Sequence, residues 1–139
     1  MPALDPAFLA TSDAVGDLAV CHVRLQRDAR FPWLVLIPRG EGLQEIEDLD
    51  RDDRARLMAE IVAGGEAVRA IGAALGRPVA KLNVGQLGNV TPQLHVHVVG
   101  RRADDPAWPG PVWGAGVAED YQEAELARAL AAARTALGL

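Results

Sequence analysis

The sequence predicts an α+β domain in which helices cover one face of an antiparallel sheet. Several short apolar segments have the composition and the period of β-strands. Short polar turns join neighbouring strands, and one long helical segment, 50–75, is inserted between two strand pairs. This order of elements is typical of the α+β class. A chain of 139 residues corresponds to one domain.

The first part of the chain is predicted to contain a short helix and two strands. The short helix is expected over Asp5–Leu9, behind a proline. β-branched and apolar residues dominate Asp17–Leu25, which predicts a strand. The polar segment Gln26–Arg30 indicates a turn. The continuous apolar run Trp33–Ile37 indicates a strand that is covered on both faces.

A long helix is predicted over Asp50–Leu75. Its apolar residues recur at helical spacing, acidic residues crowd its start, and Gly76 and Pro78 end it. Three glycines lie on or beside the apolar stripe, and each costs the helix about 1 kcal/mol relative to alanine. We therefore expect the helix to approach the sheet closely there. These glycines are Gly64, Gly65 and Gly72.

The second part of the chain is predicted to add two strands and a second helix. Val79–Val84 and Gln93–Val99 have strand patterns and are separated by the loop Gly85–Pro92. Arg101–Ala118 is rich in proline and glycine, and so long an irregular segment is usually functional or interfacial. The alanine- and leucine-rich segment Glu119–Leu137 predicts a helix.

Composition excludes several classes of protein. The net charge of −5 argues against a nonspecific nucleic-acid-binding surface, which requires a basic face. The single cysteine, Cys21, lies in an apolar run, and we expect it to be a small core residue. No segment approaches the roughly 18 apolar residues that span a membrane, and Met1–Thr11 has no signal-peptide pattern. We therefore expect a cytoplasmic protein.

The chemistry-bearing residues gather in the predicted strand Gln93–Val99. Alternate side chains of a strand share a face and lie about 7 Å apart, which places Gln93, His95 and His97 together. The pKa of histidine lies near neutrality, so one imidazole can attack phosphorus while its neighbour donates a hydrogen bond. The pattern favours a site for phosphoryl chemistry.

The loop before this strand supplies neutral hydrogen-bond donors. Gly85 and Gly88 would let main-chain N–H groups approach an anion closely, and Asn83 and Asn89 add amides. Arg101–Arg102 follow the strand, and they either add charge to the site or are solvated loop charges. Together these residues predict a phosphate-binding site.

The ordered set of segments resembles the histidine triad (HIT) superfamily, whose motif is His-φ-His-φ-His-φ-φ with φ apolar. Gln93–Val99 is similar to that motif, and Pro32–Pro38 is similar to a strand ending in proline in these proteins. Trp108–Gly110 is similar to the Trp-Pro-Pro-Gly tail of the Hint branch. The details look most similar to bacterial HIT proteins described as diadenosine tetraphosphate hydrolase-like.

The resemblance implies an antiparallel sheet of about five strands with two helices. It implies one HIT domain over residues 1–139, with the motif region at 83–102 and a tail and helix at 103–139. It also implies a symmetric homodimer whose substrate is a nucleotide. No metal cofactor is required in this scheme, although magnesium can accompany the substrate phosphates.

Residue roles are also implied by the resemblance. His95 matches the nucleophile, which attacks the α-phosphorus and forms a nucleotidyl-imidazole that water then hydrolyses. His97 matches the histidine that contacts the phosphate and the leaving group. Asn83 matches an amide that binds phosphate, and Asn89 follows the loop glycine where relatives often have glutamine.

The sequence departs from the family pattern at three positions. Gln93 replaces the first histidine of the motif; it cannot titrate near neutral pH but can orient a neighbour through a hydrogen bond. Trp33 stands where Hint proteins have another histidine. His22 falls near the position of their ribose-binding acid, which makes it a candidate for contact with the nucleoside.

Other interpretations remain open. His95 and His97 also have the spacing of a metal-ligand pair, or they are structural residues. Trp33 and Trp108 suit packing, a dimer contact or contact with a nucleobase. The predicted function is hydrolysis at the α-phosphorus of a dinucleoside polyphosphate or a nucleoside phosphoramidate. Nucleotidyl transfer is the alternative within enzymes, and a nearly inactive nucleotide-binding or sensor protein is the alternative outside them.

Overall fold

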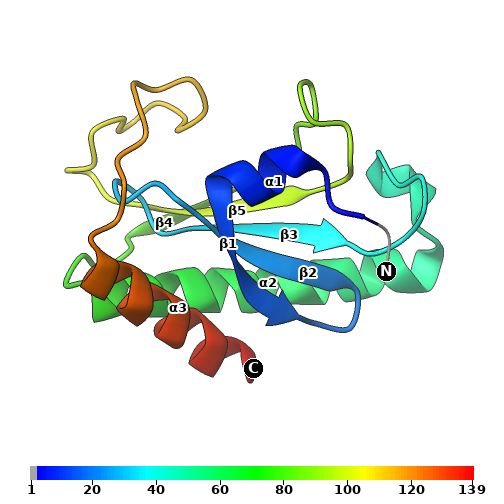
Figure 1. Ribbon diagram of the computed structural model, residues 1–139, viewed down its shortest axis with the longest axis horizontal. Helices are drawn as coiled ribbons and strands as arrows, with labels where there is room; N and C mark the ends of the chain where they lie inside the picture. The colour runs from blue at the N-terminus through cyan, green and yellow to red at the C-terminus, as the bar shows by residue number, and fades with distance from the viewer. Residues whose placement is uncertain (1–2) are drawn as a thin grey trace.

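The computed structural model describes residues 3–139, which form a five-stranded antiparallel sheet with three helices (Figure 1). The strand order is β1-β2-β3-β5-β4. The strands are β1 (Ser12–Asp17), β2 (Cys21–Gln26), β3 (Trp33–Pro38), β4 (Lys81–Gly85) and β5 (Val96–Arg101), and the helices are α1 (Pro6–Thr11), α2 (Arg51–Ala74) and α3 (Glu123–Leu137), with a 3₁₀ turn at Ile46–Asp48. The predicted α+β class, with two long helices and a short one near the N-terminus, is confirmed.

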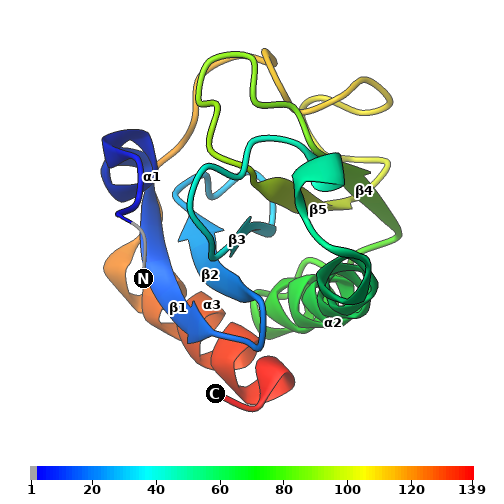
Figure 2. The same cartoon turned by 90° about the vertical axis from the view of Figure 1, so that its right-hand side faces the viewer.

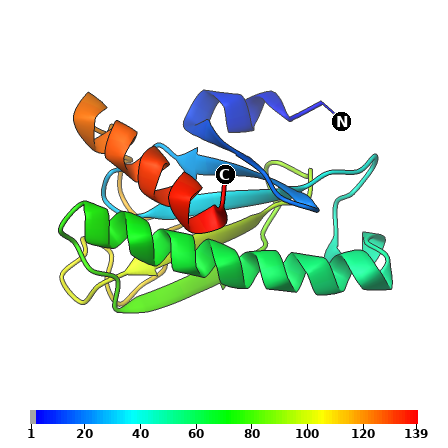
Figure 3. The same ribbon diagram turned by 90° about the horizontal axis from the view of Figure 1, so that it is seen from below.

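Helices α2 and α3 cover one face of the sheet, as Figures 2 and 3 show. The main core lies between this face and the helices; it includes Cys21, the predicted small core residue. Strand β3 lies in the middle of the sheet, and all six of its residues are buried, as its apolar run predicted. In residues 3–139 no helix is long and apolar enough to cross a membrane.

The glycines of α2 allow the helix to lie close to its neighbours. Asp50 caps the helix by accepting a hydrogen bond from the main-chain N–H of Asp53. A Cβ atom at Gly65 would lie 2.7 Å from the side chain of Leu82 in β4. A Cβ atom at Gly72 would lie 2.7 Å from the carbonyl oxygen of Arg77. The predicted close approach to the sheet is therefore confirmed at Gly65, whereas Gly72 makes room for the loop that follows the helix.

The opposite face of the sheet carries α1, the loop 86–95 and the long segment 102–122 (Figure 2). A second core cluster lies here, separate from the core under α2 and α3. Its members are Phe8, Phe31, Trp33, Val35, Ile37, Val99 and Val112. This face also holds both histidines of the motif.

The single strand predicted over Asp17–Leu25 is wrong, because the chain makes a hairpin there. β1 ends at Asp17, and β2 begins at Cys21. The apolar residues between the strands form the turn, where the side chain of Glu60 in α2 accepts hydrogen bonds from the N–H groups of Val20 and Cys21. This distant carboxylate stabilises a turn that no local pattern marks.

Two other predicted boundaries are also wrong. The strand predicted from Gln93 begins only at Val96, because the N–H of Leu94 donates to the carbonyl oxygen of Leu43 and not to a neighbouring strand. The helix predicted from Glu119 begins at Glu123. The carbonyl oxygen of Glu119 instead accepts a hydrogen bond from the N–H of Ala29, which holds the chain against the loop between β2 and β3 before the helix starts.

Candidate active site

His95 lies immediately before β5, and the main chain determines its tautomer. Its Nδ1 lies 2.7 Å from the carbonyl oxygen of Gln93. A carbonyl oxygen only accepts, so in the neutral ring Nδ1 carries the proton and Nε2 carries the lone pair. The ring is 6% exposed, and Phe8 of α1 contacts it edge-on with the ring centroids 5.0 Å apart. Nucleophilic attack through Nε2 requires this tautomer.

His97 has the opposite tautomer. It lies in β5, paired with Val35 of β3 and Gly85 of β4. The indole N–H of Trp33 donates a hydrogen bond of 3.0 Å to its Nδ1. An indole nitrogen only donates, so Nδ1 holds the lone pair and Nε2 carries the proton. The imidazole centroids of His95 and His97 are 4.8 Å apart, and both rings line the same cavity.

The environment keeps His97 neutral. Burial, with a smaller contribution from His95, lowers the pKa of His97 from 6.5 to about 4. The hydrogen bond from Trp33 acts in the same direction, because a protonated Nδ1 could not accept it. His97 is therefore a neutral hydrogen-bond donor at physiological pH.

This pKa shift predicts a loss of stability in acid. The folded chain binds a proton at His97 less readily than the unfolded chain, so the stabilisation is fully present above pH 6.5 and is lost as the pH falls towards about 4. The loss contributed by His97 is on the order of 3 kcal/mol. The free energy of unfolding can be measured in urea near neutral pH and near pH 4 for the wild-type protein and for His97→Gln. The fall in this free energy between the two pH values should be smaller in His97→Gln than in the wild-type protein. Equal differences in the two proteins would contradict the prediction.

A cavity of about 290 Å³ lies between the two imidazoles and the preceding loop. Asn89 lines it, so the structure brings this predicted phosphate-binding residue together with both histidines. The lining residues are Leu87, Gly88, Asn89, Val90, Thr91, His95 and His97. None of them carries a carboxylate. Among residues 3–139, no group of three or more histidine, cysteine, aspartate or glutamate side chains could hold a metal ion.

Gln93 is not part of this cavity, and its side chain points to α1. Its Oε1 accepts a hydrogen bond of 2.8 Å from the main-chain N–H of Asp5, whose carboxylate caps α1. Because α1 carries Phe8, which packs on His95, the Gln93 side chain can act on the nucleophile only through the helix. The expected orienting amide therefore contacts a helix cap, while its main-chain carbonyl contacts His95.

Substitutions at position 93 should separate these two contacts. Gln93→Leu removes the acceptor for Asp5, and we expect about fivefold slower turnover because one lost hydrogen bond is worth about 1 kcal/mol. Gln93→Glu keeps an oxygen acceptor and should stay closer to the wild-type rate. Hydrogen exchange of the α1 amides should rise only in the leucine variant. Gln44→Leu, at an exposed glutamine across a neighbouring cavity, is the matched control. Full activity of Gln93→Leu would show that the Gln93 side chain does not contribute to turnover.

Asn83 and Arg101 lie together, away from the cavity. The Oδ1 of Asn83 accepts a hydrogen bond of 2.8 Å from Arg101, which is also paired with Asp105. The expectation that Arg101 is a phosphate ligand or a solvated charge is wrong, because the side chain is 1% exposed and its guanidinium is engaged. A phosphate-binding role for Asn83 stays a prediction that depends on its amide nitrogen.

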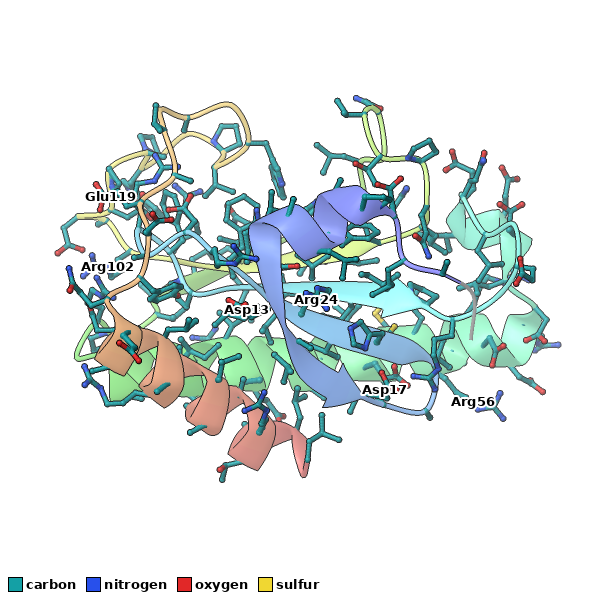
Figure 4. The ribbon with its side chains drawn as sticks, viewed as in Figure 1. Asp13, Asp17, Arg24, Arg56, Arg102 and Glu119 are labelled. Atoms are coloured by element: carbon teal, nitrogen blue, oxygen red, sulfur yellow. The ribbon has the colours of Figure 1, made fainter. Side chains whose placement is uncertain are left out.

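His22 is held on β2 by two neighbours. Its Nδ1 lies 2.6 Å from Asp17, and its Nε2 lies 3.3 Å from a guanidinium nitrogen of Arg24. Figure 4 labels both neighbours, on β1 and β2. His22 does not line the cavity over the histidine pair. Its contact with a nucleoside remains a prediction.

The sequence did not point to Trp113, which packs against the site. Its ring centroid lies 5.5 Å from that of His97 and 6.3 Å from that of Trp33. A Cβ atom at Gly85 would lie 2.8 Å from the Trp113 ring, so this glycine makes room for an indole and not, as expected, for an anion. The only signal in the sequence was the length of the irregular segment that contains Trp113.

A second cavity, of about 260 Å³, adjoins the two tryptophans Trp33 and Trp113. Gln26, Asp28 and Arg30 also line it, and Arg30 forms an ion pair of 2.8 Å with Asp28. The segment 102–122 closes this end of the molecule, where Figure 4 labels Arg102 and Glu119. The sequence indicated only a polar turn over these residues of β2 and its loop.

The fold and the pair of oppositely protonated imidazoles define a domain of the histidine triad class. The HIT domain profile matches residues 8–104. The chain belongs to the HIT family.

Solved structures agree over nearly the whole chain. A histidine triad protein from Bradyrhizobium japonicum is 37% identical, with a TM-score of 0.90 and 97% of each chain covered. One from Sinorhizobium meliloti is 38% identical, with a TM-score of 0.87, covering 97% of this chain and 96% of that one. One from Marinobacter aquaeolei is 36% identical, with a TM-score of 0.88, covering 98% of this chain and 96% of that one. A comparison with curated proteins found no match.

Proposed function

We propose that the protein hydrolyses a nucleoside phosphate derivative at its α-phosphorus, with His95 as the nucleophile. The observation that carries the proposal is the pair of tautomers: His95 presents a lone pair at Nε2, and His97 presents an N–H group beside it. A substrate phosphate in the cavity of about 290 Å³ would meet a nucleophile and a neutral donor together.

The reaction proceeds in two steps in this proposal. In the first, Nε2 of His95 forms a bond to phosphorus, and the bond from phosphorus to the leaving group breaks with its electron pair. The positive charge on the imidazole is stabilised by the Gln93 carbonyl, which accepts from Nδ1–H. In the second, water attacks phosphorus, the P–N bond breaks, and its electron pair returns to Nε2. The proton of the water passes to bulk solvent.

The second cavity is the proposed place for the nucleoside. It adjoins the histidine pair through Trp33 and Trp113, so an apolar base has two indole surfaces beside it. No metal takes part in the chemical step of this proposal, and magnesium enters with the substrate phosphates.

Trapping the covalent intermediate tests the proposal. The wild-type protein is mixed with diadenosine tetraphosphate or an adenosine phosphoramidate, with and without a chelator, and quenched rapidly. We expect nucleoside monophosphate as product in both conditions, and a nucleotidyl adduct that peptide mapping locates to His95. Nucleotide joined to an added acceptor would indicate a transferase. Binding without turnover of any nucleotide would favour the sensor alternative, and activity lost with chelator and restored by zinc would favour a metal site.

We also propose a homodimer through the β4 edge of the sheet. Among residues 3–139, β4 is an edge strand with no strand partner on one side of its backbone, and Val84 is 51% exposed. Helix α2 runs beside it, and Met58 and Val62, one helical turn apart, are 61% and 59% exposed. An apolar strip of this kind is typical of a protein interface.

Light scattering should therefore give twice the mass of the chain at micromolar concentration. Val62→Glu should lower the mass to that of one chain, because it places a charge in the strip. Val117→Glu, at an exposed valine in the segment before α3, is the matched control and should remain dimeric. A monomeric wild-type protein would contradict the proposal.

A further inference from the structure

We propose that the site prefers substrates whose leaving group departs as an anion, such as a phosphate or polyphosphate, over nucleoside phosphoramidates. This inference rests on the proposed hydrolysis at the α-phosphorus and narrows its substrate class. The observation behind it is the hydrogen bond from the Trp33 indole to Nδ1 of His97.

The two kinds of substrate differ in their need for a proton. When the bond from the α-phosphorus to a bridging oxygen breaks, the departing phosphate carries the electron pair as a stable anion. When a P–N bond to an alkylamine breaks, the nitrogen must gain a proton as it leaves, because an amide anion is far too basic to depart. A phosphoramidate hydrolase therefore needs a general acid beside the leaving group.

Neither imidazole of the cavity can serve as that acid. His95 uses Nε2 to form the bond to phosphorus, and its Nδ1–H is directed at the carbonyl oxygen of Gln93. His97 holds one proton, on Nε2, and a neutral imidazole N–H donates a hydrogen bond without giving up its proton. A second proton would have to enter at Nδ1, which the Trp33 N–H already occupies.

Among the residues that the structure describes, those that line the cavity supply no substitute. The remaining lining residues of the cavity have neutral side chains. Asp28 is paired with Arg30, and Asp105 is buried against Arg101. Burial also lowers the pKa of His97 to about 4. The hydrogen bond from the Trp33 indole favours the same neutral form, because a protonated Nδ1 could not accept it. These contacts therefore favour a leaving group that departs as an anion and needs no proton.

Rates for two substrates with the same nucleoside test the inference. The wild-type protein is assayed with diadenosine tetraphosphate and with an adenosine N-alkylphosphoramidate, and kcat/KM is compared. We expect the first to be preferred by about 100-fold or more, since a general acid typically contributes this factor. Equal rates, or a faster phosphoramidate, would overturn the preference while leaving the proposed function standing. Turnover of neither would overturn the proposed function, and the preference with it.

Substitution of Trp33 gives a second arm. Trp33→His places a titratable ring against Nδ1 of His97, and Trp33→Phe removes the indole donor, so both should raise the relative rate on the phosphoramidate by about tenfold. Trp108→Phe, at an indole that stacks on Arg101 outside the cavity, should leave the ratio unchanged.

Nitrogen NMR of the wild-type protein should show His97 as the neutral Nε2–H tautomer at neutral pH. A protonated or Nδ1–H imidazole at this pH would overturn the inference even without any activity.

Discussion

His95→Ala is expected to lower turnover by at least about a thousandfold while leaving nucleotide affinity within a few-fold of the wild-type value. The nucleophile contributes to the transition state far more than to ground-state binding. No neighbour can replace it, because the free lone pair of His97 faces Trp33 and not the cavity. Single-turnover rates and a nucleotide titration followed by tryptophan fluorescence measure the two quantities separately.

His97→Ala is the informative comparison for this result. It removes the donor N–H that faces the cavity, so both affinity and turnover should fall. A His95→Ala protein with near-normal turnover would reject His95 as the nucleophile. A His95→Ala protein that no longer binds nucleotide would contradict the expectation that His95 contributes more to the transition state than to ground-state binding.

Asp105→Ala is expected to destabilise the fold by about 3–5 kcal/mol. The variant leaves the guanidinium of Arg101 buried without a counter-charge, since the two side chains are each 1% exposed and joined at 2.9 Å. It also removes the acceptor for the main-chain N–H groups of Arg102, Ala107 and Trp108. The start of the segment 102–122 should therefore loosen together with the loss of stability.

Denaturant unfolding measures this change, and the neighbouring carboxylate supplies the control. Asp104 is 78% exposed and lies 3.6 Å from Arg102, so Asp104→Ala should change stability by no more than about 0.5 kcal/mol. If the two variants lost similar amounts of unfolding free energy, burial of the Arg101–Asp105 pair would not explain why the Asp105 carboxylate stabilises the fold.

Local patterns were sufficient for the elements whose pattern is strong. The periodic segment Asp50–Leu75 became α2 within one residue at each end, and the apolar run Trp33–Ile37 became the buried central strand β3. His95 and His97 lie side by side because alternate side chains of an extended chain share a face, and these two residues stand at the start of β5. Each of these features depends on residues that are close together in the chain.

Patterns failed where a distant group supplies the hydrogen bonds. The β1–β2 hairpin was read as one strand because its turn is apolar and is stabilised by Glu60 of α2. Gln93 was expected beside the histidines, but the N–H of Asp5 draws its side chain to α1. Arg101 was expected near solvent or phosphate and is instead neutralised in the interior.

The amino-acid order therefore specified most strands of the sheet, the long helices and the presence of a histidine pair, since periodicity and chain neighbours encode these features. The protonation pattern of the histidine pair could not be predicted from the sequence. It depends on Trp33, on the Gln93 carbonyl and on burial under Phe8 and Trp113, which folding brings from separate parts of the chain. Hydrogen-bond direction and desolvation arise only when these groups meet, and they assign one imidazole to attack and the other to donate.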